Sequence, residues 1–288
     1  MTGSPKTIQI FLPGGDPRGI RVAEITTRIV QVIEVPRSLL ADFLRMAESG
    51  QVGVYFLFGQ EDESSDQRVY IGQTGELRQR LASHNQTKEF WDRAVVLISR
   101  THSLTQTHAL FLEWYCLQAA RKAGRYSDEN GNAGSKPHTP APLEADCLEI
   151  FETGHVLVST LGFRLFDPVV SPAASPEERE LYFCKSSDAD GRGLYTSDGF
   201  VVLKGSSGRK DVVPSFVATT HMAVRQSLID SGVMEVQGDR VVFAKDHLFR
   251  SPSGAAIILM GRTANGWVDW RNEAGQTLDS LKRQSVNA

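Results

Sequence analysis

The sequence predicts an α+β protein made of more than one compact unit. The chain has 288 residues, more than one average domain, and 41% of them are hydrophobic, which is enough to fill substantial cores. Segments with β-strand alternation are interleaved with segments of helical periodicity. Stretches rich in Gly, Pro and small residues, at 131–142 and 170–180, interrupt these patterns. We expect an N-terminal β-hairpin extension over 1–48, a first domain over 49–135, a linker with a helix over 136–180 and a separate α+β domain over 181–288.

Bulk composition argues against several classes of protein. The cysteines, Cys116, Cys147 and Cys184, are widely spaced and form no CxxC or His/Cys cluster, so we expect reduced structural thiols. The N-terminus lacks a charged segment followed by an apolar core, and no apolar run approaches the roughly 18 residues of a membrane span. These features predict a cytoplasmic protein with no membrane partner. The net charge of -3 argues against binding nucleic acid through bulk basicity, so any such site must be local.

The first half of the chain predicts a hairpin, a short helix and then a β-β-α-β-α series. β-branched and polar residues alternate over 7–12, a PGGDPRG turn follows, and a second extended run covers 20–35. PRSLLADFLRM then predicts a short helix. The series that follows comprises strands at 52–59 and 68–74, a helix at 76–85, a strand at 93–100 and a helix at about 103–123.

The second half predicts a helix at about 143–161 and then a module of short strands and helices from 181 onwards. Ser251 and Pro252 suit a helix start, with serine as the cap and proline in the first turn. Gly266 before Trp267 predicts a turn into a final strand. In such a strand Trp267 and Trp270 would face opposite sides, so at least one belongs to the core.

Glu113 is the most unusual carboxylate in the sequence. It lies three residues after Leu110 and four before Leu117, which with Ala120 form an apolar stripe on the predicted helix. An unpaired buried charge is costly, so such a group is normally neutralised, paired with a base or used as a metal ligand. The alternative is a carboxylate at the rim of the core that pairs with an arginine.

Two further pairs of side chains stand out. Arg80 and His84 are four residues apart and therefore lie on one face of a helix. Tyr55 and Tyr70 each belong to a strand with a nearby glycine, which permits close approach of the backbone. Each feature also has a structural explanation, because paired tyrosines usually pack together, a lone arginine is usually solvated and a lone histidine is usually a satisfied structural group.

The order of these residues resembles the GIY-YIG nuclease family over residues 51–132. The first tripeptide is Gly-Val-Tyr instead of Gly-Ile-Tyr, which keeps a β-branched strand residue. The last residue of the family pattern is an asparagine at the turn after the helix that carries Glu113. Both Asn130 and Asn132 lie there, and we favour Asn130 because it follows Arg125 and Tyr126, as in similar proteins with the same C-terminal module. The matching residues are Tyr55, Tyr70, Arg80, His84, Glu113 and Asn130.

The resemblance implies a small three-stranded antiparallel sheet flanked by helices, and an endonuclease that hydrolyses DNA with Mg²⁺ (or Mn²⁺). It implies Glu113 as the sole protein ligand of the metal and Arg80 as the clamp on the scissile phosphate. Tyr55 would lie beside the attacking water as a general base, with His84 as the alternative carrier of the proton. Tyr70 would position water or phosphate, and Asn130 would hold the site together by hydrogen bonds.

The C-terminal region contains the segments GFVVLKGSSGRK at 199–210 and FRSPSGAAIILMGRTANGWVDWRNEAGQTL at 249–278. With these segments it resembles, over about 181–284, the uncharacterised DUF4357 type of domain. Its KGSSGRK loop is too short and wrongly spaced for a phosphate-binding P-loop, so a hairpin turn is favoured over phosphate binding. The candidate nucleic-acid contacts are Arg78, Lys88 and Arg93 in the first domain and Lys204, Arg209 and Lys210 in this loop.

The implied pathways are restriction, defence against foreign DNA, or repair. One site per chain cuts one strand, so a double-strand break would need a homodimer or two successive nicks. Two other functions stay open. The chain could be a non-catalytic protein that binds nucleic acid or a partner on a GIY-YIG scaffold, or a nuclease specific for single strands, particular structures or RNA.

Overall fold

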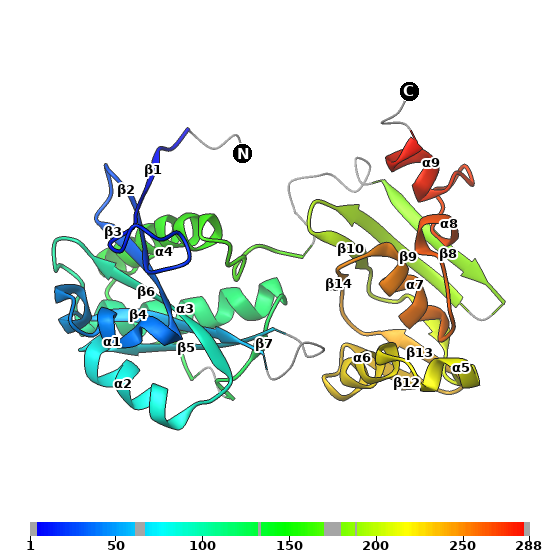
Figure 1. The fold of residues 1–288 in the computed structure, drawn as a ribbon, viewed down its shortest axis with the longest axis horizontal. Coiled ribbons are helices and arrows are strands. Elements are labelled where there is room, and N and C mark those ends of the chain that lie inside the picture. Colours follow the sequence, from blue (N-terminus) through cyan, green and yellow to red (C-terminus); the bar gives the residue numbers. More distant parts are fainter. Residues whose placement is uncertain (1–4, 61–66, 132–133, 170–179, 188, 285–288) are drawn as a thin grey trace. The chain divides into compact units, whose positions relative to one another are not determined.

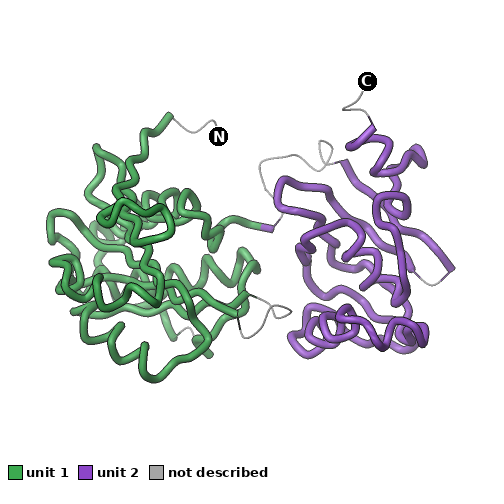
Figure 2. Tube along the Cα trace, in the orientation of Figure 1, with its two compact units in different colours: residues 1–168 green, residues 169–288 purple. Residues whose placement is uncertain are grey.

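The chain forms two compact units, Met1–Pro168 and Val169–Ala288, which are distinguished in Figure 2. The computed structural model describes residues 5–60, 67–131, 134–169, 180–187 and 189–284. Both units combine one sheet with helices (Figure 1). The predicted two-domain α+β layout is therefore confirmed.

Within the described residues, unit 1 is built on a seven-stranded sheet with the order β1-β2-β3-β6-β4-β5-β7. Neighbouring strands are antiparallel except β5 and β7, which are parallel. The strands are β1 (Ile8–Phe11), β2 (Arg21–Ile25), β3 (Val30–Pro36), β4 (Gly53–Gly59), β5 (Arg68–Thr74), β6 (Trp91–Ser99) and β7 (Ser127–Asp128).

The sheet is larger than the three strands that the family resemblance implied. β4, β5 and β6 are those three strands, but β3 pairs with β6 along its whole length, from Val30 opposite Ser99 to Pro36 opposite Arg93. The strands assigned to an N-terminal extension therefore continue the same sheet. The physical reason is that β6 is buried on both faces and needs a hydrogen-bonding neighbour on each side.

The helices of unit 1 cover both faces of this sheet (Figure 1). Side chains alternate along β4, so its residues contribute to two different cores. Val54, Phe56 and Phe58 belong to the core with α3 and α4, whereas Tyr55 and Leu57 belong to the core with α1 and α2. The helical elements are η1 (Arg37–Leu39), α1 (Leu40–Phe43), η2 (Ala47–Gly50), α2 (Leu77–Thr87), α3 (Gln106–Ala123) and α4 (Ala141–Thr160).

Helix α4 packs within unit 1, whereas the sequence assigns it to a linker over 136–180. Its side chains Cys147, Ile150 and Leu157 recur at helical spacing and are buried in the core shared with α3. The helix therefore belongs to unit 1, which ends at Pro168. Most of the second predicted linker, 170–179, lies outside the described residues.

Helix α3 begins with a capping box formed by Thr105 and His108 and ends at Gly124, whose φ of 68° is left-handed. Leu117 and Ala120 are buried as predicted, but Leu110 is 41% exposed. Because α3 packs on both the sheet and α4, its buried face is centred on Leu112 and Cys116. Glu113 consequently lies at the margin of this face and is partly buried.

Unit 2 contains a second sheet with the order β12-β13-β11-β9-β10-β14, and β8 pairs with β9. Its core includes the buried rings of Tyr182, Phe200, Phe243 and Trp270. The strands are β8 (Leu181–Ser186), β9 (Ala189–Thr196), β10 (Gly199–Val202), β11 (Ser207–Arg209), β12 (Met234–Gln237), β13 (Arg240–Phe243) and β14 (His247–Phe249). The helices are α5 (Pro214–Val217), α6 (Thr220–Asp230), α7 (Pro252–Met260), α8 (Gly266–Asp269) and α9 (Leu278–Lys282).

The predicted start of α7 is confirmed, because the Ser251 hydroxyl accepts a hydrogen bond from the Gly254 N–H at 3.1 Å. The predicted final strand at Gly266 is wrong. The Asn265 side chain accepts a hydrogen bond from the Trp267 N–H at 3.2 Å and caps the short helix α8 instead. Trp270 is fully buried, so the expectation of a core tryptophan is confirmed.

The cysteines Cys116, Cys147 and Cys184 are all buried and free, as expected for structural thiols. Burial raises the pKa of Cys147 to about 11, so its thiol is protonated at neutral pH. Across the described residues, no helix combines the length and the apolar composition needed to cross a membrane.

Candidate active site

Tyr55 lies in the middle of β4, and its ring is fully buried on the side of the sheet that faces α1 and α2. The residue opposite on β5 is Gly72. A Cβ atom at Gly72 would lie 2.3 Å from the Tyr55 hydroxyl oxygen. The glycine after Tyr70 and Ile71 therefore provides the space that the Tyr55 hydroxyl occupies.

We expect Gly72→Ala to lower the free energy of unfolding by about 1–3 kcal/mol, because the new methyl group overlaps a buried phenol. Urea unfolding followed by circular dichroism measures this loss. Gly50→Ala is the matched control, since a Cβ atom there meets nothing within 4 Å. Equal stability of the two variants would show that the Tyr55 hydroxyl is not held against Gly72.

The Tyr55 hydroxyl joins two side chains of α2. The Arg80 Nε–H donates to the Tyr55 oxygen at 3.0 Å, and the His84 Nε2 lies 2.8 Å from the same oxygen. Because Arg80 can only donate, the Tyr55 hydrogen is directed to His84, whose Nε2 accepts it. A neutral His84 then carries its own proton on Nδ1, which is buried and has no hydrogen-bond partner among the described residues.

Burial and neighbouring cations determine the protonation of this group. Burial raises the pKa of Tyr55 above its usual value, although the hydrogen bond from Arg80 opposes this effect. Burial together with the positive charges of Arg80 and Lys88 lowers the pKa of His84 to about 4. At neutral pH, Tyr55 is therefore a neutral phenol and His84 a neutral imidazole.

This low pKa predicts a pH-dependent contribution of His84 to stability. The unfolded chain protonates this imidazole below a pH of about 6.5, whereas the folded chain does so only below about 4. The unfolded state thus binds more protons between these values, so the contribution is complete above pH 6.5 and is lost as the pH falls towards 4.

We expect the unfolding free energy of the wild type to fall by about 2–3 kcal/mol more than that of His84→Gln between pH 7 and pH 4. Chemical unfolding of both proteins at several pH values measures the difference, and the comparison cancels the contributions of other titrating groups. Parallel pH profiles would mean that His84 is exposed to solvent in the folded chain.

Tyr70 on β5 completes the aromatic part of the site. Its ring centroid lies 6.2 Å from that of Tyr55 and 5.2 Å from that of His84. The Lys88 Nζ lies 4.1 Å from the centre of the Tyr70 ring, which is a cation–π contact. A hydrogen bond with Tyr70 also contributes to the raised pKa of Arg80, so both phenols converge on one guanidinium.

Glu113 reaches this group from α3. Burial raises the pKa of its carboxyl, while a hydrogen bond from the Gln73 backbone and the charge of Arg80 oppose the shift. The charge of Glu113 in turn contributes to the raised pKa of Tyr55. The carboxylate is therefore within electrostatic range of Tyr55 and Arg80, although it comes from a helix in the opposite core.

Asn130 follows β7 and pairs with the backbone of β5. The Ile71 N–H donates to the Asn130 Oδ1 at 2.9 Å, and the Asn130 Nδ2 donates to the Ile71 carbonyl. The asparagine thus lies against the strand segment between Tyr70 and Gly72 and fixes its position. The competing residue, Asn132, lies outside the described residues.

Gln73 contributes to the site although the sequence did not predict it. Its backbone N–H contacts Glu113, and its side chain accepts a hydrogen bond from Gln106 at the start of α3. These contacts connect the end of β5 to α3. The signal in the sequence is weak, because Gln73 directly follows the Tyr-Ile-Gly triplet but glutamine itself is a common surface residue.

The predicted nucleic-acid contacts of unit 1 divide into two groups. Lys88 caps the C-terminus of α2 and contacts the Tyr70 ring, whereas Arg78 lies in the first turn of α2 and its Nε donates to the Ser49 hydroxyl at 3.1 Å. Arg93 instead forms an ion pair at 3.1 Å with Glu34, a carboxylate that is only 2% exposed. Burial raises the pKa of Glu34, and the charges of Arg21 and Arg93 oppose this effect, so Arg93 helps to stabilise the ionised form of a buried carboxylate.

The KGSSGRK loop of unit 2 connects β10 to β11, which are separated in the sheet by β9. The prediction that this loop is a hairpin turn is therefore wrong. The Lys204 N–H donates to the Asp246 carboxylate at 2.8 Å, and the Lys210 N–H donates to the Asp239 carbonyl at 3.0 Å. The Arg209 carbonyl accepts a hydrogen bond from Arg225. These backbone contacts hold the loop in place.

The donor set suits a hard divalent cation bound through one carboxylate. In the described part of the chain, no three His, Cys, Asp or Glu side chains converge as metal ligands. Mg²⁺ keeps several water ligands and needs only one or two protein carboxylates when a phosphate completes its shell. A partly buried Glu113 with a raised pKa would gain from such a cation, so the residues present fit the metal.

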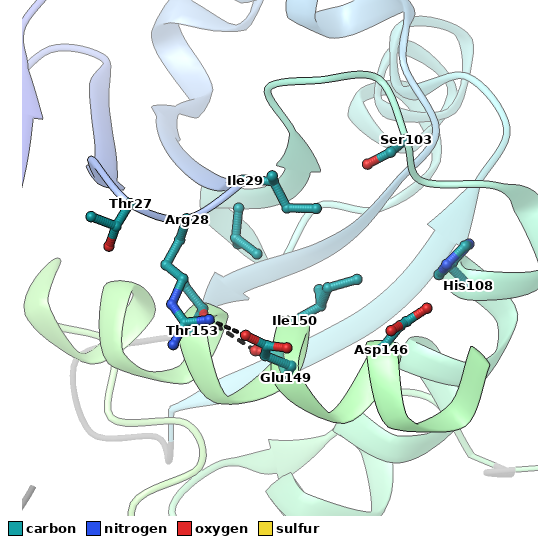
Figure 3. A pocket seen from close by; sticks show the side chains of 10 residues that line it. Thr27, Arg28, Ile29, Ser103, His108, Asp146, Glu149, Ile150 and Thr153 are labelled. Carbon is teal, nitrogen blue, oxygen red and sulfur yellow. Dashed lines mark hydrogen bonds and ion pairs between the residues drawn. The ribbon is translucent and has the colours of Figure 1, made fainter. Parts of the chain in front are cut away.

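Unit 1 also has a cavity of about 520 Å³ elsewhere, between the β2–β3 turn, the start of α3 and α4 (Figure 3). Arg28 and Glu149 form an ion pair in it, and Ile29 and Ile150 contribute apolar walls. The residues that line it do not include Tyr55, Tyr70 or Arg80. This cavity is therefore separate from the polar group described above.

Comparison with known proteins identifies the class of unit 2. Residues 182–282 match the family described as "Domain of unknown function (DUF4357)". The match runs from β8 to α9, so the predicted DUF4357-type domain is confirmed. No curated protein and no solved structure matches the chain. The GIY-YIG assignment of unit 1 stays a prediction.

Proposed function

We propose that the chain is a divalent-metal-dependent endonuclease that hydrolyses phosphodiester bonds in DNA, with a GIY-YIG-type active site in unit 1. The observation that carries this proposal is the Tyr55 hydroxyl, which is hydrogen-bonded to both Arg80 and His84 within electrostatic range of Glu113. Phosphodiester hydrolysis requires a cation on the phosphate, a path for the proton of water and stabilisation of the leaving oxygen. This group of side chains supplies candidates for each.

Arg80 would bind the scissile phosphate. Its Nε–H is used by Tyr55 and a further donor by Tyr70, which together orient the planar guanidinium, and the remaining donors would bind the ligand. Guanidinium groups bind phosphate oxygens in pairs, and the attraction increases as negative charge builds up on the phosphate. Tyr70, partly exposed beside Arg80, would position the phosphate or the attacking water through its hydroxyl.

Tyr55 and His84 would move the proton. The raised pKa of Tyr55 makes the free phenolate rare, so Tyr55 alone is a poor base at neutral pH. In a relay, Tyr55 takes a proton from water while it passes its own proton to the Nε2 of His84. The hydrogen bond from Arg80 stabilises the partial negative charge on the Tyr55 oxygen during this transfer.

Glu113 would hold the metal, with its carboxylate oriented by the Gln73 N–H. A bound divalent cation supplies Lewis-acid stabilisation of the charge on the phosphate and on the leaving oxygen. Such chemistry serves restriction, defence against foreign DNA, or repair. In each of these pathways unit 2 would select or position the substrate.

Supercoiled plasmid and circular single-stranded DNA test this proposal together. We expect Mg²⁺ or Mn²⁺ to support strand breaks that a chelator prevents. Nicked circles that precede linear molecules indicate successive nicks, whereas direct linearisation indicates a homodimer. Binding of either DNA with no cleavage under both metals would overturn the proposal in favour of a non-catalytic nucleic-acid-binding protein.

A further inference from the structure

Unit 2 contains an open cleft of about 700 Å³. It lies between the second half of β8, the connection from α7 to α8, and the turn that follows α8. Its lining residues are Phe183, Lys185, Ser186, Met260, Arg262, Asp269, Arg271, Asn272, Glu273 and Gly275. The cleft is large enough for one or two nucleotide-sized groups, since small-molecule sites are typically about 300–1,000 Å³.

Three cations from three different segments line this cleft. Lys185 comes from β8, Arg262 follows α7, and Arg271 follows α8. The Arg262 Nη1 donates to the Thr263 carbonyl at 3.0 Å, and the Arg271 Nη1 donates to the Gly275 carbonyl at 3.2 Å. Each of these bonds orients a guanidinium and uses one of its five donors, so donors stay available for phosphate oxygens.

An apolar surface lies beside these cations. Met260 is buried, and the ring of Phe183 is partly buried. The Lys185 Nζ lies 5.3 Å from the centre of the Phe183 ring, so a positive charge and an aromatic face occur together. This combination is typical of sites that bind the phosphate of a nucleotide and stack its base on a ring.

The acidic residues of the cleft do not cancel its positive charge. The Asp269 carboxylate accepts a hydrogen bond from the Asn265 N–H at 2.8 Å, which helps to hold α8. Both Asp269 and Arg262 affect the pKa of the buried Cys184, so these opposite charges lie close to the same thiol. Glu273 is exposed. The lining carries three cations, Lys185, Arg262 and Arg271, against the carboxylates of Asp269 and Glu273, so the cleft keeps an excess of one positive charge.

We propose that this cleft binds a single strand of nucleic acid, with phosphates at Lys185, Arg262 and Arg271 and a base on Phe183. A single strand fits better than a duplex, because stacking on a side chain requires a base whose face is free. An acidic peptide would use the cations but gain little from the ring. We thus place the binding site of unit 2 in the cleft, and the KGSSGRK loop that holds Lys204 is the rival site.

Fluorescence anisotropy of a labelled oligothymidylate tests the proposal with the full chain in a chelator, so that binding is measured without cleavage and independently of the hydrolytic site. We expect Lys185→Gln and Arg271→Gln each to reduce the slope of log K against log salt by about 0.7. Phe183→Leu, which keeps an apolar side chain, should weaken binding about fivefold or more. Lys245→Gln, at an exposed lysine that does not line the cleft, is the matched control and should bind as the wild type does. Lys204→Gln tests the loop as a rival site.

Three outcomes would overturn the proposal. The first is wild-type binding by all three cleft variants. The second is a loss of affinity in Lys204→Gln equal to that in Lys185→Gln. The third is competition by polyglutamate as effective as competition by unlabelled oligonucleotide at equal charge, which would make the cleft a general polyanion site. If Phe183→Leu does not fold, Lys185→Gln still tests the proposal, because Lys185 is exposed and its effect is measured as the salt dependence of binding.

Discussion

Glu113→Gln is expected to reduce metal-dependent DNA cleavage by about a thousandfold or more, since it removes the one carboxylate that would hold the metal. The same change should leave the free energy of unfolding unchanged or higher. Burial raises the pKa of Glu113, which means that the fold favours the neutral form of this side chain. A neutral amide of the same shape removes that unfavourable charge.

Cleavage rates and urea unfolding of the same preparations measure the two effects. The control is Glu152→Gln, which removes an exposed carboxylate on α4 of the same unit. It should change neither quantity. A Glu113→Gln protein that cleaves like the wild type would remove the metal site from the mechanism, and a large loss of stability would assign Glu113 a structural role.

Arg80→Lys is expected to lower kcat for cleavage by about a hundredfold or more, which is typical when a transition-state donor is lost. Lysine keeps the charge but loses the Nε–H that binds Tyr55 and the planar fork that binds two phosphate oxygens. The loss should appear in kcat rather than in KM, because the contact strengthens as the phosphate gains charge.

Arg78→Lys provides the comparison, since Arg78 lies two residues earlier on α2 and donates to the Ser49 hydroxyl. It should affect KM alone if it contacts the DNA backbone. Equal losses of kcat in the two variants would mean that cleavage depends on guanidinium groups of α2 in general, and not on the Tyr55–Arg80 contact.

The local elements of the fold could be predicted from the sequence, because strand alternation and helical spacing are properties of neighbouring residues. The pairing of β3 with β6 could not, since it joins segments about 60 residues apart. The same limit explains the predicted linker, because the buried face of α4 is recognisable but its partner is not. Gly266 was misassigned because the capping role of Asn265 was not recognised.

Part of the candidate site could likewise be predicted from the sequence, and part could not. The i,i+4 spacing of Arg80 and His84 predicts a shared helix face, and Tyr55 lies on the strand face that α2 covers. The contact between Glu113 and Gln73 depends on how α3 crosses the end of β5, which no sequence pattern specifies. The pairing of Arg93 with Glu34 could not be predicted, because Glu34 lies on a strand that the sequence assigns to a separate extension.

The anomalous scattering of Mn²⁺ in crystals grown with a phosphorothioate oligonucleotide shows whether Glu113 holds the metal beside the bound phosphate. We expect one Mn²⁺ peak, about 2.0–2.5 Å from a Glu113 carboxylate oxygen, with a backbone phosphate in hydrogen-bond contact with Arg80. A map with phosphate beside Arg80 and Tyr55 but no metal on Glu113 at saturating Mn²⁺ would contradict this expectation.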